Sequence, residues 1–137
     1  MTLYFGDGTD ISTATGLGAN LVNSTQTIKT SGSGFYVNWG ATSSDAISLN
    51  YAASSSSNKL LIICSLTVGL DFSGRIGANL YIGGSVESAM IADTSGNRTR
   101  RTSGEHAGSS YNISNISFNY LKSSPSTSST TYSVRLG

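Results

Sequence analysis

Every second residue is aliphatic over several segments of this chain, and this period of two restricts the fold more than any other feature of the sequence. From Ile76 to Ile82 the aliphatic residues fall on alternate positions, and therefore on one face of a strand. No segment of 11 or more residues has the i, i+3, i+4, i+7 spacing of an amphipathic helix. Clusters of Gly and Ser separate the alternating segments, as turns separate strands. The sequence therefore predicts an all-β fold.

Seven segments fit the strand pattern, and the one at 86–91 fits it weakly. They are residues 35–39, 47–51, 59–68, 76–82, 86–91, 111–121 and 132–136. Short strands joined by short turns are typical of an antiparallel β-sandwich or jelly roll, in which two sheets pack face to face. We expect this architecture.

Two of these segments carry an unusual pattern. Residues 59–68 are apolar on both phases, which predicts a strand that is covered on both faces. In residues 111–121, Tyr111 and Ile113 share one phase, whereas Ile116 and Phe118 lie on the other. A β-bulge at Ser114-Asn115 would insert one extra residue and bring both sets to one face.

The first part of the chain differs from the rest. Residues 1–33 hold few large apolar groups and several turn formers, so we expect an extended N-terminal arm, followed by the β-sandwich over residues 34–137. The arm contains short apolar pieces that we expect to dock onto the domain or onto a neighbouring subunit. They are Leu3, Tyr4, Phe5, Leu21 and Val22.

Charge is scarce. Only 11% of the residues are charged, against about a quarter in typical domains, and 27 serines take many of the remaining polar positions. The net charge of +1 gives no field that would attract nucleic acid or an anionic membrane. The opening MTLYFGDGTD does not read as a signal peptide, so we expect synthesis in a cytoplasm. A weakly charged surface suits a subunit that is partly covered in an assembly.

Residues for catalysis or for binding a metal or cofactor are few. His106 is the single histidine, and we expect it in a surface loop at 102–106. One His and one Cys cannot supply the three or four ligands of a zinc site, and Cys64 lies among aliphatic residues as a core side chain does. No Gly-x-Ser-x-Gly elbow is present. We expect no enzyme, no metal and no cofactor.

The one concentrated charge is the cluster Arg98, Arg100 and Arg101. These side chains would either bind an anionic sugar, a phosphate or an acidic group of an adjacent subunit, such as Asp71 or Glu87, or form a solvated hairpin loop. For binding to sugars, Tyr36 and Tyr81 are further candidates, because exposed aromatic rings stack on sugar rings.

Four blocks of the chain resemble one family. They are the opening MTLYFGDGT, AASSSSNKLLI at 52–62, FNYLKSSPST at 118–127 and SSTTYSVR at 128–135. They are similar to virion structural proteins of tailed phages, especially those that infect cyanobacteria. The resemblance implies a homotrimer with a fold like the heads of tumour necrosis factor and complement proteins. Relatives continue with another loop and a closing strand, so the sequence is either a naturally short version or the ordered part of a longer protein.

The sequence therefore favours a non-enzymatic virion protein that forms trimers on the particle surface. We expect a capsid decoration or cement protein whose partners are the major capsid protein or other virion proteins. The alternative is a receptor-binding tip of a tail fibre or vertex appendage that recognises host surface polysaccharide. A hydrolase acting on the same polysaccharide is a third possibility.

Overall fold

The computed structural model describes residues 24–28, 45–69, 74–93, 96, 100–107 and 113–137. Regular structure in these ranges consists of strands and one short 3-10 helix, η1 (Ser88–Met90), with no α-helix. The strands are β1 (Asp45–Tyr51), β2 (Lys59–Gly69), β3 (Gly74–Ile82), β4 (Ser85–Val86), β5 (Ser103–Ala107), β6 (Ile113–Ser123) and β7 (Thr130–Leu136). All their pairings are antiparallel. The predicted all-β fold is confirmed.

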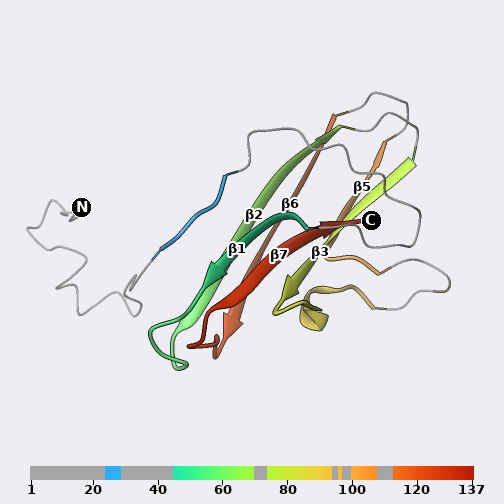
Figure 1. The fold of residues 1–137 in the computed structure, drawn as a ribbon. Coiled ribbons are helices and arrows are strands. Elements are labelled where there is room, and N and C mark those ends of the chain that lie inside the picture. The colour runs from blue at the N-terminus through green and yellow to red at the C-terminus, as the bar shows by residue number, and fades with distance from the viewer. Residues whose placement is uncertain (1–23, 29–44, 70–73, 94–95, 97–99, 108–112) are drawn as a thin grey trace, which may run out of the picture.

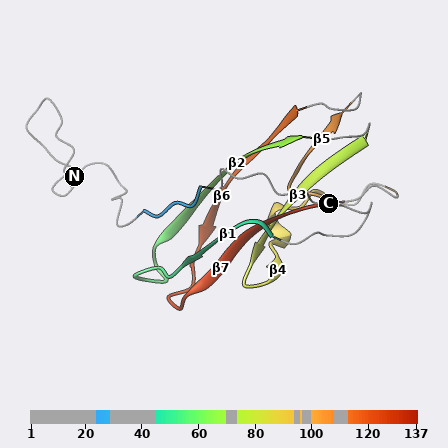
Figure 2. The same cartoon turned by 45° about the horizontal axis from the view of Figure 1, so that its top comes forward.

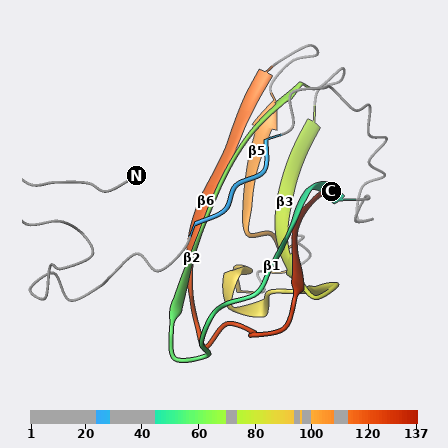
Figure 3. The same cartoon turned by 60° about the vertical axis from the view of Figure 1, so that its left-hand side comes forward.

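The strands form two sheets. One has the order β1-β7-β3-β4, with β5 also paired to β3, and the other consists of β2 and β6 (Figure 1). Figure 2 shows β1 beside β7 and β2 beside β6, as the pairings require. In Figure 3 the β2–β6 sheet and the larger sheet lie as two layers. On one side β5 approaches β6, where the Ser103 hydroxyl donates to the Ser117 carbonyl at 3.3 Å.

The two sheets share one apolar core. Ala78 and Val134 of the larger sheet are buried in one cluster with Ile116 of β6. Cys64 of β2 and Phe118 of β6 are half-buried against the same cluster. The alternation along each strand explains this arrangement, because every second side chain of a strand points to the same face. The core is therefore built from the inner faces of both sheets.

The turn between β3 and β4 depends on two glycines. Gly83 and Gly84 both have positive φ, at 59° and 83°. A two-residue hairpin turn with positive φ at both positions matches the right-handed twist of the strands, and glycine adopts this conformation at little cost. The pair therefore allows β4 to fold back directly onto β3.

The segment predicted as a strand at 86–91 is mostly not one. β4 ends at Val86, and Glu87 then caps η1, where its carboxylate accepts a hydrogen bond from the Ala89 backbone N–H at 3.4 Å. The prediction of a loop around His106 is also wrong, since His106 lies in β5 opposite Arg75 of β3. The segment 103–107 has no alternation of large apolar residues, so its sequence gave no strand signal.

The predicted bulge at Ser114-Asn115 is absent. β6 pairs with β2 without a register shift, from Ile113 opposite Gly69 to Ser123 opposite Lys59. Ile113 consequently points to the outer face, where it is 78% exposed. A register shift lies instead in β1, between Asp45 and Ile47.

Other predictions fall outside the described residues. These are the strand at 35–39 and almost all of the N-terminal arm at 1–33, of which the structure describes only 24–28. All five residues of 24–28 are exposed. No helix in the described part of the chain is long and apolar enough to cross a membrane.

Candidate functional site

The outer face of the β2–β6 sheet carries large aliphatic side chains. Leu61 of β2 lies directly opposite Leu121 of β6, and they are 58% and 52% exposed. Ile63, two residues along β2 from Leu61, is 74% exposed. The three side chains lie on the same face because positions two apart, and positions opposite each other, point the same way. We call Leu61, Ile63 and Leu121 the aliphatic patch.

The sequence prediction of two covered faces for the segment 59–68 is therefore wrong within the described chain. The inner-facing residues of β2, such as Cys64 and Leu66, pack against the core, whereas Leu61 and Ile63 are exposed. The apolar residues on both phases were the signal for this patch. The sequence alone could not show that the outer phase has no cover from the described strands.

The rest of this outer face is polar but nearly uncharged. Beyond the aliphatic patch, its exposed polar side chains are Ser65, Thr67, Asn115, Ser117, Asn119 and Ser123, with the aliphatic Ile113 at the far end. Lys59, at the end of β2, is the one charged residue on this face. The aromatic residues Phe118 and Tyr120 lie on the opposite, inner phase of β6. This face therefore offers aliphatic, hydroxyl and amide groups.

The larger sheet has a different outer face. The Arg135 guanidinium donates from Nε to Asp45 Oδ1 at 2.7 Å, and its Cζ lies 4.1 Å from the centroid of the Tyr81 ring. The hydrogen bond from Arg135 lowers the pKa of Asp45, and the same bond raises the pKa of Arg135. Arg135 therefore covers one side of the Tyr81 ring, which leaves that side unable to stack on a sugar.

The arginine cluster is only partly described. Arg98 lies outside the described residues, whereas Arg100 donates from Nε to the Ala92 carbonyl at 2.6 Å. The Arg101 side chain lies against Gly77 of β3, so closely that a Cβ at Gly77 would be 2.6 Å from Arg101 Cγ. Both described arginines thus make contacts within their own chain. Within the described part of the chain, neither Arg100 nor Arg101 makes a hydrogen bond or a ring contact with Tyr81.

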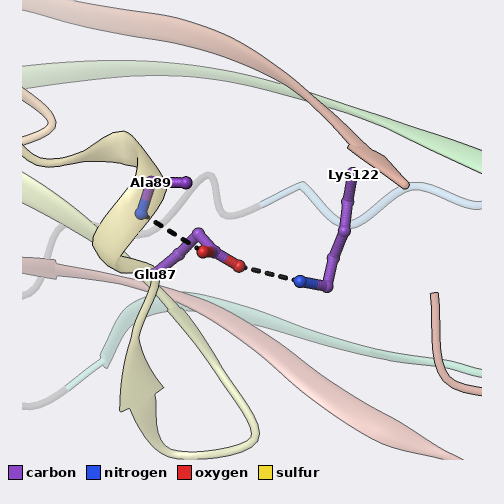
Figure 4. Close-up of polar contacts among 3 residues, drawn as sticks. All are labelled: Glu87, Ala89 and Lys122. Atoms are coloured by element: carbon purple, nitrogen blue, oxygen red, sulfur yellow. Dashed lines mark hydrogen bonds and ion pairs between the residues drawn. The ribbon is translucent and has the colours of Figure 1, made fainter. Parts of the chain in front are cut away.

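An ion pair connects the two sheets. Lys122 of β6 donates to Glu87 Oε2 at 2.9 Å, while Glu87 Oε1 accepts from Ala89 (Figure 4). The hydrogen bond from Lys122 lowers the pKa of Glu87 and raises that of Lys122. The hydroxyl of Tyr132 is buried and has no hydrogen-bond partner among the described residues, and burial raises its pKa. Glu87, expected as a partner for arginines, is thus bound to a lysine of the same chain.

Groups that could supply reactive chemistry are sparse in the described ranges. Cys64 packs against the core, and burial raises the pKa of its thiol to about 11. No group of three or more His, Cys, Asp or Glu residues lies together there as a metal site would require.

Several predicted contact residues lie outside the described residues. They are Tyr36, Leu3, Tyr4, Phe5, Leu21 and Val22. Comparison with known proteins adds no further assignment, since the chain matches no family model, no curated protein and no solved structure.

Proposed function

We propose that this chain is a non-enzymatic structural protein of a phage virion, which forms homotrimers on the particle surface as a capsid decoration or cement protein. One observation carries the proposal of an assembly subunit. The aliphatic patch is exposed on a sheet whose remaining outer residues are almost all uncharged. Contiguous exposed aliphatic groups commonly mark surfaces that another protein covers. The virion context rests on the four sequence blocks that resemble phage structural proteins.

In this proposal the two sheets form a β-sandwich of the jelly-roll type, preceded by an extended N-terminal arm. The shared core and the antiparallel pairing support the sandwich. The arms would lie over neighbouring capsid subunits, and many copies would together give strong avidity. The protein would be made in the host cytoplasm and would bind neither nucleic acid nor membrane.

The alternative function, a receptor-binding tip that recognises host polysaccharide, has less support. Arg135 covers one side of the Tyr81 ring, and Arg100 and Arg101 contact their own chain. A hydrolase has less support still, because the sequence has a single histidine as a candidate base and no Gly-x-Ser-x-Gly elbow for a nucleophile.

A cryo-electron reconstruction of the particle that carries this chain tests the proposal. Trimers distributed over the capsid lattice are the expected result. Copies confined to the tail or to the tips of appendages would contradict capsid decoration and would make host recognition the leading function. Absence of the chain from purified particles would contradict the virion assignment altogether.

A further inference from the structure

We infer that the outer face of the β2–β6 sheet is the surface through which copies of this chain contact each other, with the aliphatic patch at the centre of the contact. This inference deepens the proposed function. The number of copies, three, rests on that proposed function. The choice of this face, and of a copy of the same chain as its occupant, rests on the structure.

The aliphatic side chains are arranged to be buried together. Leu61 and Leu121 are direct cross-strand neighbours, and Ile63 lies diagonally from Leu121, opposite Asn119. Cross-strand and diagonal neighbours on one face are close enough for their side chains to touch. The three side chains therefore form one continuous apolar surface, each more than half exposed. Removing such a surface from water is the main driving force of protein association.

The chemistry of the face argues against other classes of partner. A sugar-binding face would present aromatic rings, yet Phe118 and Tyr120 of β6 lie on the inner phase. A face for nucleic acid would present several cations, whereas Lys59 is the one charged residue here. A partner with a strongly charged surface would meet almost no charge of opposite sign on this face. The partner that fits is one that is itself apolar and uncharged at the contact.

A second copy of the chain meets this requirement. The polar part of the face consists of Ser, Thr and Asn side chains, which both donate and accept hydrogen bonds. An identical face can therefore satisfy them. The chain has a net charge of +1, so two copies repel each other only weakly. Aliphatic groups from each copy would meet around the axis, with the hydroxyl and amide groups beside them.

The size of the face sets the expected strength of the contact. Eleven residue pairs on two strands give a surface roughly 37 Å long and 10 Å wide. This plan area is below the ~800 Å² per partner of a standard stable interface. Around a three-fold axis each copy touches two neighbours, which adds contact area beyond the face itself. We therefore expect an oligomer that forms in a concentration-dependent manner.

Sedimentation equilibrium of the full chain tests the inference. We compare the wild type with Ile63→Asp and Leu121→Asp, and Val86→Asp is the matched control because Val86 is exposed on the larger sheet, on β4. The wild type and Val86→Asp are expected to form the same oligomer. The two face variants are expected to associate at least ~100-fold more weakly, because a carboxylate is costly to bury among apolar groups. Far-UV circular dichroism should be the same for all four proteins.

A milder variant covers the case in which an Asp variant does not fold. Ile63→Thr keeps a β-branched side chain, which suits a strand, but removes apolar surface. It should weaken association in the same direction and by less. As a second readout, Ile63→Cys in a Cys64→Ala background should form disulfides between copies under oxidising conditions.

Two results would overturn the inference. One is a wild type that stays monomeric up to its highest soluble concentration. The other is an oligomer that persists unchanged in folded Ile63→Asp and Leu121→Asp. If the face variants break the oligomer but the chain is absent from the particle, the contact stands and the virion assignment fails.

Discussion

Glu87 and Lys122 form the ion pair that ties the two sheets together on the side of η1. Glu87 follows β4 of the larger sheet, and Lys122 is near the end of β6, 35 residues further along the chain. Their side chains are only 13% and 25% exposed. Glu87 also accepts a hydrogen bond from the Ala89 backbone N–H, which restricts the position of its carboxylate. The pair is therefore more ordered than a typical surface ion pair.

Replacement of Glu87 by Gln should lower the free energy of unfolding by about 1 kcal/mol, since a partly buried ion pair stabilises the fold more than most exposed pairs do. Urea denaturation followed by circular dichroism measures the change. Asp93→Asn is the control, because Asp93 is an exposed carboxylate, and it should have almost no effect. An equal loss in both variants would show that the pair contributes nothing specific.

The stabilisation by this pair should depend on pH at both extremes. The lowered pKa of Glu87 makes its contribution complete above about pH 4.3, and the contribution is lost as the pH falls through the folded-state pKa. The raised pKa of Lys122 makes its contribution complete below about pH 10.4, and it is lost as the pH rises further. The difference in Tm between wild type and Glu87→Gln should therefore be constant near neutral pH and shrink at both ends. A difference independent of pH would contradict the assignment.

Two isoleucines of β6 should respond very differently to the same substitution. Ile116 is 1% exposed in the core, and Ile113 is 78% exposed on the outer face. Ile116→Ala should destabilise the domain by about 3 kcal/mol through lost burial and a cavity. Ile113→Ala should change stability by less than about 0.5 kcal/mol. Denaturation at concentrations where the chain is monomeric measures both, and equal costs would show that the inner and outer phases of β6 are assigned wrongly.

The contact between Gly77 and Arg101 predicts a non-additive pair of substitutions. Gly77→Ala should cost about 1 kcal/mol, because the new Cβ overlaps Arg101 Cγ and forces that side chain to move. In an Arg101→Ala background the same change should be neutral or slightly stabilising, since alanine restricts the unfolded chain more than glycine does. A double-mutant cycle measures the difference. Additive effects would mean that Arg101 does not lie over Gly77.

Cys64 should be unreactive in the folded protein. With a thiol pKa of about 11, very little thiolate exists near pH 8, and the side chain is half-buried against the core. A thiol-specific chromogenic reagent should react slowly with native protein and rapidly in denaturant. Fast reaction under native conditions would show that the β2–β6 sheet does not cover Cys64.

The sequence predicts correctly those strands that bury one face in the core. In β3, Ile76, Ala78 and Leu80 alternate and are all buried, so the pattern and the structure agree. The sequence does not predict β5, because its residues show no aliphatic alternation. Its strand conformation is stabilised by backbone pairing with β3. The capped turn at Glu87 was missed because it depends on a local hydrogen bond.

The sequence predicts the apolar residues of the candidate site but not their exposure. The apolar residues on both phases of 59–68 are evident in the sequence, but whether the outer face is covered is a tertiary property that a local pattern does not contain. For the same reason Ile113 was assigned to the core through a bulge that β6 does not have. The contact of Arg135 with Tyr81 joins residues 54 positions apart in sequence, which no local pattern could relate.

The order of strands along the chain also determines when this body can fold during translation. β1 ends at Tyr51, but its partner β7 begins at Thr130, and β2 similarly waits for β6. At ~5–20 residues per second, the ribosome needs roughly 4 to 16 s to make the chain between β1 and β7. During that time β1 lacks its pairing partner, whereas β2 lacks its partner only until β6, which begins at Ile113, has been made. Among the described strands, the nascent chain therefore presents the aliphatic β2 unpaired until β6 has been made, and β1 unpaired until β7 has been made.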